Sequence, residues 1–300
     1  MKRMNILIHL SITKENSMNF RYLKLGLVAF LFAGTTNSCS TGSDPEDIID
    51  DIFTVPATYC LNINNGINDI VMNVNAIVMN NLDTKKDVID DEVPTGVTPT
   101  IYRTGEVIDS VVIDYGSEKT ISSLGGKFKG KVVVDPVDEK LQKFEIRLQE
   151  LEVNNFDVTG AFNFDIVGDL AGRDFSVSSS TIKFSFTDQE SNVVPFPVSS
   201  FEADYKYIRS EEDDVDYVDD IYNLTSDIDI TYPNGALMSL TSQSDLLYAY
   251  ACKNVIGGTA LFTLQDIGEG TVNYGGGDTV DHCDGDASVT SHGGTITISM

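Results

Sequence analysis

Residues 272–289, VNYGGGDTVDHCDGDASV, gather four aspartates, one histidine and one cysteine in a glycine-rich segment. Carboxylate oxygens are the hard ligands that calcium prefers. A histidine beside a cysteine suits zinc binding or the activation of a nucleophile. The segment therefore raises two alternatives, a metal or catalytic site and a β-hairpin with a solvated turn.

The four aspartates are the candidate calcium ligands, namely Asp278, Asp281, Asp284 and Asp286. Their spacing does not match the D-x-[DN]-x-[DN]-G pattern of a calcium-binding loop. No CxxC or HxxxH pattern accompanies the cysteine, so a zinc site is not expected either. We therefore expect no metal and no cofactor, and calcium at these four aspartates is the alternative.

Catalysis by a serine or cysteine nucleophile needs a base close by. Beyond the N-terminal segment the histidines are His282 and His292, and the chain has no G-x-S-x-G motif. Paired carboxylates such as those in DDVDYVDD (213–220) arise readily in a chain with 46 acidic residues. We expect no catalytic residues, and a carboxylate-dependent, carbohydrate-active hydrolase is the alternative.

The hairpin alternative assigns a role to most of the segment. Val272 to Tyr274 would form the entering strand, and Ala287 to Val289 the leaving strand. The three glycines at 275–277 suit turn positions with positive φ. The aspartates would then be solvated turn residues, since their side chains bond nearby backbone amides.

The remaining sequence must supply neighbours for this hairpin. Residues 64–83 carry apolar side chains at helical spacing and predict one short helix, and residues 84–97 read as a linker. From about residue 98 the period becomes two, with β-branched runs separated by Gly, Asn and Pro. The segment KFEIRLQELEV (143–153) fits either period, and its strand-like neighbours favour a strand. We predict a mainly β fold, with antiparallel hairpins forming an extended sheet or a sandwich over 98–300. The helix is expected to be peripheral to this domain.

The charge of the chain limits its partners. The formal net charge is −26, and it falls to −30 without the segment before Cys39, which carries five basic residues and one acidic residue. Such a chain repels phosphate backbones, so nucleic-acid binding is not expected.

The N-terminal sequence has the features of a targeting signal. Arg21 and Lys24 precede an apolar run from Leu25 to Ala33, which is shorter than a membrane-spanning helix needs. Small and polar residues follow up to Cys39, and the whole resembles a bacterial lipoprotein signal over 1–38, with Met18 as a possible start. Lipidation at Cys39 would anchor the protein to a membrane. The acidic residues that follow predict a solvated tether over 39–63.

An extracytoplasmic location permits disulfides. Beyond Cys39, three cysteines remain at Cys60, Cys252 and Cys283, which allow three single pairings.

The closing part of the chain carries a recognisable order of motifs. A cysteine is followed by Gly-Thr, Tyr-Gly-x-Gly, Cys-Asp and a last strand after Gly. The residues on this pattern are Cys252, Thr259, Tyr274, Gly275, Gly277, Cys283, Asp284 and Gly294. Over about residues 98–300 the chain thereby resembles a family of Bacteroidetes lipoproteins of unknown function.

The resemblance implies an all-β fold and a disulfide between Cys252 and Cys283. Two departures are visible. The loop SEKTISSLGG (117–126) lacks a cysteine that the family often has, which leaves Cys60 without an evident partner, and DTVDH (278–282) lengthens the closing motif.

We expect an outer-membrane lipoprotein of the cell envelope, exposed on the cell surface or facing the periplasm. Its expected role is non-enzymatic binding, adhesion or structure. The expected partners are the membrane, through the N-terminal lipid, and an envelope protein or a glycan.

Overall fold

The structure is a computed structural model of the 300-residue chain. It describes residues 45–82, 97–121, 127–138, 141–167, 174–188, 191–209, 221–249, 252, 254–276, 285–291 and 294–299. The predicted signal peptide and Cys39 lie outside the described residues. No helix in the described residues is long and apolar enough to cross a membrane.

A single helix, α2 (Pro45–Leu82), precedes all the strands in the described part of the chain. It is 38 residues long and extends toward the N-terminus beyond the residues 64–83 that the periodicity marks as helical. It also occupies most of the segment expected to be a solvated tether over 39–63. That expectation is wrong from Phe53 onward, because Phe53, Ala57, Cys60 and Leu61 are buried in the core.

The helix is the centre of the core rather than a peripheral element. Every residue from Gly66 to Asn75 is buried, the asparagines included. Asn73 donates its side-chain amide to the carbonyl of Asp69 one turn earlier, at 2.7 Å. Such bonds let a polar residue lie inside a core at low cost. The prediction that the helix is peripheral to the β domain is therefore wrong.

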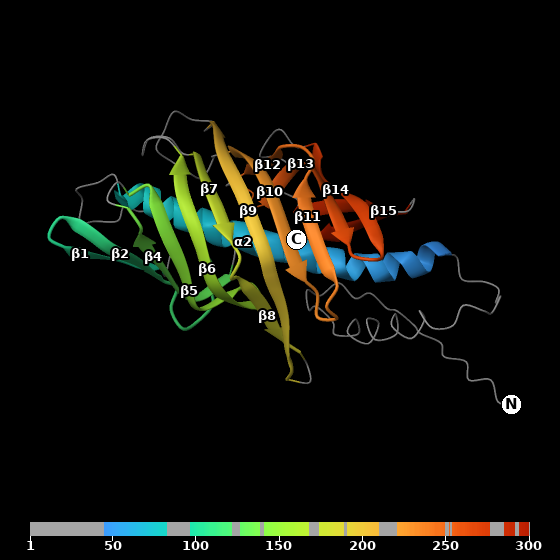
Figure 1. Ribbon diagram of the computed structural model, residues 1–300, viewed down its shortest axis with the longest axis horizontal. Coiled ribbons are helices and arrows are strands. Elements are labelled where there is room, and N and C mark those ends of the chain that lie inside the picture. Colours follow the sequence, from blue (N-terminus) through green and yellow to red (C-terminus); the bar gives the residue numbers. More distant parts are fainter. Residues whose placement is uncertain are drawn as a thin grey trace. The chain divides into compact units, whose positions relative to one another are not determined.

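The strands form one antiparallel sheet of 16 strands, which confirms the predicted fold class and selects the extended sheet over the sandwich. Thirteen strands follow one another in the order β1-β2-β4-β5-β6-β7-β9-β10-β11-β13-β14-β15-β16, and β3, β8 and β12 pair beside this path. Helix α2 runs across the sheet on one face (Figure 1).

The strands of the first half are β1 (Thr98–Thr104), β2 (Val107–Asp114), β3 (Thr120–Ile121), β4 (Lys127–Pro136), β5 (Lys143–Val153), β6 (Phe156–Val167), β7 (Asp174–Ser179) and β8 (Lys183–Thr187). Those of the second half are β9 (Val193–Arg209), β10 (Ile221–Thr231), β11 (Leu237–Ser242), β12 (Leu246–Ala249), β13 (Asn254–Leu264), β14 (Gly268–Gly276), β15 (Asp286–Ser291) and β16 (Gly294–Ser299).

Alternation along the strands separates an inner face from an outer one. In β5 the buried residues Phe144, Ile146 and Leu148 alternate with exposed charged and polar residues, so this ambiguous segment is a strand. The inner face carries a run of stacked rings across β6, β7 and β9. Phe175 stacks on Phe164 at 4.8 Å and on Tyr205 at 4.4 Å between ring centroids. Helix α2 packs against this face.

Two interruptions in the strand path bend the sheet locally. β7 and β8 follow one another between β6 and β9, and β11 and β12 do the same between β10 and β13. Thr241 is opposite Asp227 and Leu246 is opposite Leu224, so the β11–β12 line has two more residues than β10 over the same distance. Such bulges increase strand twist and curvature.

A glycine on the neighbouring strand accompanies the β11–β12 bulge. Gly258 in β13 has a φ of +98°, and a Cβ at this position would lie 2.7 Å from the carbonyl oxygen of Asp245. Only glycine adopts this backbone conformation without strain while allowing so close an approach. The bulge therefore depends on the glycine beside it.

The hairpin predicted at 272–289 is present at its strands. β14 pairs with β15 in antiparallel orientation, with Val272 opposite Val289 and Asn273 opposite Ser288. The turn residues 277–284 lie outside the described residues. The strand part of the hairpin prediction is thus confirmed.

Candidate functional site

The outer face of the sheet carries two rows of polar side chains that run across the strands. The first row is Asp165, Ser176, Asp204 and Thr225 in successive paired positions on β6, β7, β9 and β10. The second row is Asn163, Ser178, Glu202, Asp227 and Thr241, which extends to β11. Paired residues on neighbouring strands bring their side chains within about 5 Å of one another, so each row is continuous.

The alternation of buried and outward-facing residues along each strand produces these rows. In β7 the buried Phe175 and Val177 alternate with Ser176 and Ser178, and in β9 the buried Phe201, Ala203 and Tyr205 alternate with the two acidic residues of the rows. The inner residues pack toward the helix, and the polar residues between them must therefore face outward.

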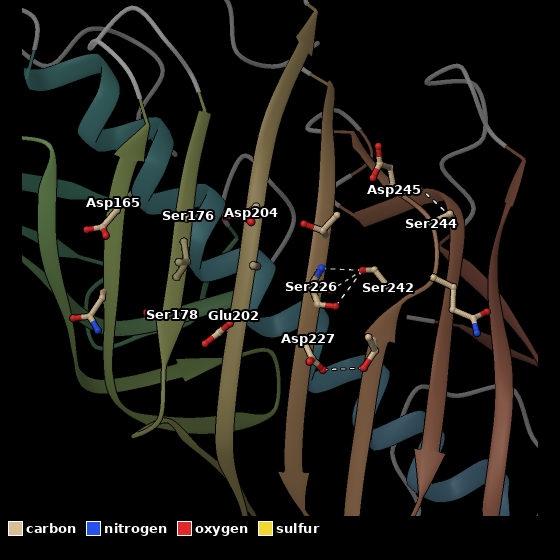
Figure 2. Close-up of a pocket in the computed structure, with 16 residues that line it drawn as sticks. Asp165, Ser176, Ser178, Glu202, Asp204, Ser226, Asp227, Ser242, Ser244 and Asp245 are labelled. Carbon is tan, nitrogen blue, oxygen red and sulfur yellow. Dashed lines mark hydrogen bonds between the residues drawn. The ribbon is translucent and has the colours of Figure 1, made fainter.

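The β11–β12 bulge forms one wall beside the rows. Ser226 donates its backbone amide to Oγ of Ser242 at 2.8 Å, and this hydroxyl donates to the Ser226 carbonyl at 3.1 Å. The amides of Gln243 and Ser244 both donate to the carbonyl of Thr259. Figure 2 shows the bonds between Ser226 and Ser242, which hold the bulge against β10. The bonds to Thr259 hold it against β13.

The rows and the bulge line a groove of about 580 Å³. Five of its lining residues are acidic, namely Asp165, Glu202, Asp204, Asp227 and Asp245. The others are Ser, Thr, Asn, Gln and two small apolar residues, and no Lys, Arg or His is among the described residues that line the groove. The groove therefore combines negative charge with many hydroxyl and amide groups.

Two of the carboxylates have described partners at the edges of the groove. Thr241 donates its hydroxyl to Asp227 at 2.8 Å, and Lys143 lies 3.7 Å from Asp165. Both partners of the Lys143 pair are largely exposed, so the pair contributes little. A ligand could replace water at these carboxylates without breaking a buried bond.

The groove carries one pair of carboxylates in a solvated setting. Glu202 and Asp227 are opposite each other on β9 and β10, which places two carboxylates side by side. Both residues are exposed to solvent on the sheet face. A glycosidase relies on an acid in an apolar environment that keeps its proton near neutral pH. The groove has no such environment among its described lining residues.

The buried titratable groups belong to the core. Burial raises the pKa of the Cys60 thiol well above its usual range, and the charge of Asp229 adds to this effect. Burial likewise raises the pKa of Tyr205 and Tyr274. These groups stay protonated at neutral pH, so the Cys60 thiol is not poised as a nucleophile.

The candidate calcium ligands fall mostly outside the described residues. This applies to Asp278, Asp281 and Asp284, while Asp286 lies on β15, where its carboxylate accepts a 2.6 Å bond from the Ser299 hydroxyl. Within the described residues no three His, Cys, Asp or Glu side chains gather as a metal site. The calcium alternative at 278–286 stays untested.

The structure describes two of the three cysteines that follow Cys39. Cys60 is a free and buried thiol, and Cys252 lies in the turn after β12 and is not a free thiol. Cys283 lies outside the described residues, and no disulfide joins two of the described cysteines. The pairing of Cys252 with Cys283 therefore stays a prediction.

Sequence reasoning alone did not find the groove. Its residues come from five strands and from the bulge between β11 and β12, over residues 163–245, and none belongs to a spaced motif. The available signal was the regular alternation of Ser, Asp and Glu with apolar residues in β7 and β9. That signal marks the outer face but not which strands lie together. No family model, no curated protein and no solved structure matches the chain.

Proposed function

We propose that this protein is an envelope lipoprotein that binds its ligand without chemical conversion, at the groove across β6, β7, β9, β10 and β11. The observation that carries the proposal is the pair of cross-strand rows described above. They present carboxylate, hydroxyl and amide groups together on one side of a rigid sheet. Sites built on strands hold their groups more accurately than sites on loops.

The chemistry of the lining favours a neutral or amine-bearing glycan as the ligand. Sugar hydroxyls donate hydrogen bonds to carboxylates, and the serine and threonine hydroxyls both donate and accept. Five carboxylates without a basic lining residue disfavour anionic ligands. Successive strands lie about 4.8 Å apart, so an elongated ligand lying across the strands would meet one polar position per strand.

A glycan array with wild-type protein and two double variants tests this proposal. Glu202→Gln with Asp227→Asn changes the groove, and Asp157→Asn with Glu269→Gln removes the same charge elsewhere on the sheet. We expect the wild type and the second variant to retain neutral or amine-bearing glycans, and the groove variant to lose at least about tenfold in affinity, or 1.4 kcal/mol.

Two results would contradict the binding proposal. Equal binding by both variants would remove the groove as the site. Cleavage of a retained glycan, lost in the groove variant alone, would favour the carbohydrate-active hydrolase instead.

The anchor is the second part of the proposal. We propose that Cys39 is lipidated and holds the protein at the outer membrane, as the basic and apolar residues before it indicate. Labelled palmitate should enter the wild-type protein and not the Cys39→Ser variant, and equal labelling of both would contradict lipidation. Protease treatment of whole cells then tests surface exposure separately.

A further inference from the structure

We infer that β16 is a self-pairing edge, through which two copies of this chain join their sheets in antiparallel orientation. β16 is an end of the sheet, and it pairs with β15 alone among the described strands. An edge strand leaves a row of backbone N–H and C=O groups without strand partners, which is a template for another strand.

The two ends of the sheet differ in how they are protected. β1, at the other end, contains Pro99 and Arg103 and has a register shift between Tyr102 and Arg103. Proline, charge and irregular pairing are the devices that normally prevent edge-to-edge association. β1 is thus a protected edge.

β16 has none of these devices. Its sequence, GTITIS, contains no proline and no charged residue, and it pairs with β15 over six consecutive positions without a register shift. Asp286 is the charged residue of β15, and its carboxylate accepts a bond from Ser299. The strongly acidic chain therefore presents an uncharged, regular and β-branched strand at this edge.

The pattern of β16 complements itself. Thr295, Thr297 and Ser299 are exposed on the outer face, while Ile298 is buried and Ile296 is half-buried on the inner face. A two-fold axis through Thr297 places Ile296 opposite the second copy's Ile298, and Thr295 opposite the second copy's Ser299. Apolar residues then face apolar residues, and hydroxyls face hydroxyls. This axis keeps the whole run from 295 to 299 paired.

The contact is small and the copies repel each other. One strand pair buries less than the roughly 1,000 Å² expected of a stable interface. With a formal charge of −30 on each chain from residue 39 onward, association should strengthen as salt screens the repulsion. We therefore expect the dimer to form reversibly. A disulfide cross-link across the contact is a suitable way to detect it.

Cysteine trapping on the mature chain with Cys39→Ser tests the pairing. Thr297→Cys places the new thiol on the axis, opposite its own copy and within the Cα separation that a disulfide needs. Thr295→Cys is the matched control, because the axis places it opposite Ser299. We expect oxidation to cross-link Thr297→Cys into a dimer, more completely as salt rises, and to leave Thr295→Cys monomeric.

A second variant tests whether the cross-link requires pairing of the two β16 strands rather than random collision between molecules. Ile296→Lys added to Thr297→Cys places a charge on the edge, and it should abolish the cross-link while circular dichroism shows an unchanged fold. Equal cross-linking of Thr295→Cys and Thr297→Cys, or a Thr297→Cys protein that stays monomeric at every salt concentration, would overturn the inference. Glycan binding at the groove is independent of either result.

Discussion

The hydroxyl of Tyr205 donates a 2.6 Å hydrogen bond to Oδ1 of Asn68, and both residues are buried. This bond joins the middle of the sheet to the middle of helix α2 across 137 residues of sequence. Asn75 donates to the Tyr222 hydroxyl in the same interface at 3.4 Å. The contact between the helix and the sheet is thus specified by polar bonds as well as by apolar packing.

Tyr205→Phe should lower the free energy of unfolding by about 1–3 kcal/mol, because it leaves the Asn68 carbonyl oxygen buried without its donor. Urea unfolding followed by circular dichroism measures the change. Tyr102→Phe, at a tyrosine that is 53% exposed, is the control and should have no effect. If Tyr205→Phe unfolds at the wild-type midpoint, the bond does not contribute.

Removing α2 should prevent folding. A chain that begins at residue 97 loses the apolar residues that fill the inner face of the sheet, so we expect it to show no cooperative thermal transition. A chain that begins at residue 40 keeps the helix and should unfold cooperatively. A cooperative transition in the shorter chain would show that the sheet is stable by itself.

A comparison of Gly258→Ala with Gly235→Ala separates the cost of backbone strain from the cost of a steric clash between the new Cβ and the bulge. The two glycines have similar φ values of +98° and +91°, but a Cβ at Gly235 would have nothing within 4 Å. Gly235→Ala should cost about 1–3 kcal/mol from strain alone. Gly258→Ala should cost more, because its Cβ would lie 2.9 Å from Cα of Leu246 as well as against Asp245. Equal midpoints in urea would contradict the close approach at the bulge.

The ion pair of Lys131 and Asp114 should make stability depend on pH. The Lys131 ammonium, 2.9 Å away, and the Gly116 amide lower the pKa of Asp114. The carboxylate therefore stabilises the fold above the pKa of the unfolded chain, and this contribution is lost as pH falls through the lower pKa of the folded state. Asp114→Asn should be slightly less stable than wild type at neutral pH, with the difference vanishing in acid. The urea unfolding midpoints of the wild type and Asp114→Asn are compared from pH 7 down to pH 2. A difference that stays constant with pH would contradict a role for the ion pair.

The disulfide implied by the family resemblance is open to direct test. Mass spectrometry of the non-reduced protein should find Cys252 and Cys283 in one linked peptide, and Cys60 as a free thiol. Alkylation of both Cys252 and Cys283 before reduction would exclude the pair.

The sequence predicted local features well where one period dominated. The two strands on either side of the glycine-rich segment follow from the alternation there, and Val272 lies opposite Val289 on them. The helical face at Ile67, Ile70, Val71 and Val74 is buried as its spacing indicates. These features depend on neighbours within a few residues, which a single sequence displays.

The errors came from long-range packing. Helix α2 contains asparagines, which usually indicate a solvent-facing side. Yet Asn64, Asn68 and Asn75 all lie inside the core. The groove escaped prediction for a related reason. It requires that β7 and β8 share the space between β6 and β9, and that a bulge close its side, and no local pattern specifies either arrangement.

The position of α2 ahead of every described strand has a consequence for the order of folding. The helix is synthesised before any described strand, but its tyrosine partners on β9 and β10 lie 137 and 147 residues further on. Contacts of such separation form late and slow the folding of a domain. The early helix must stay uncovered until β9 and β10 have been made. Packing of the sheet on the helix can therefore be completed only after nearly three quarters of the chain, up to the start of β10, has been synthesised.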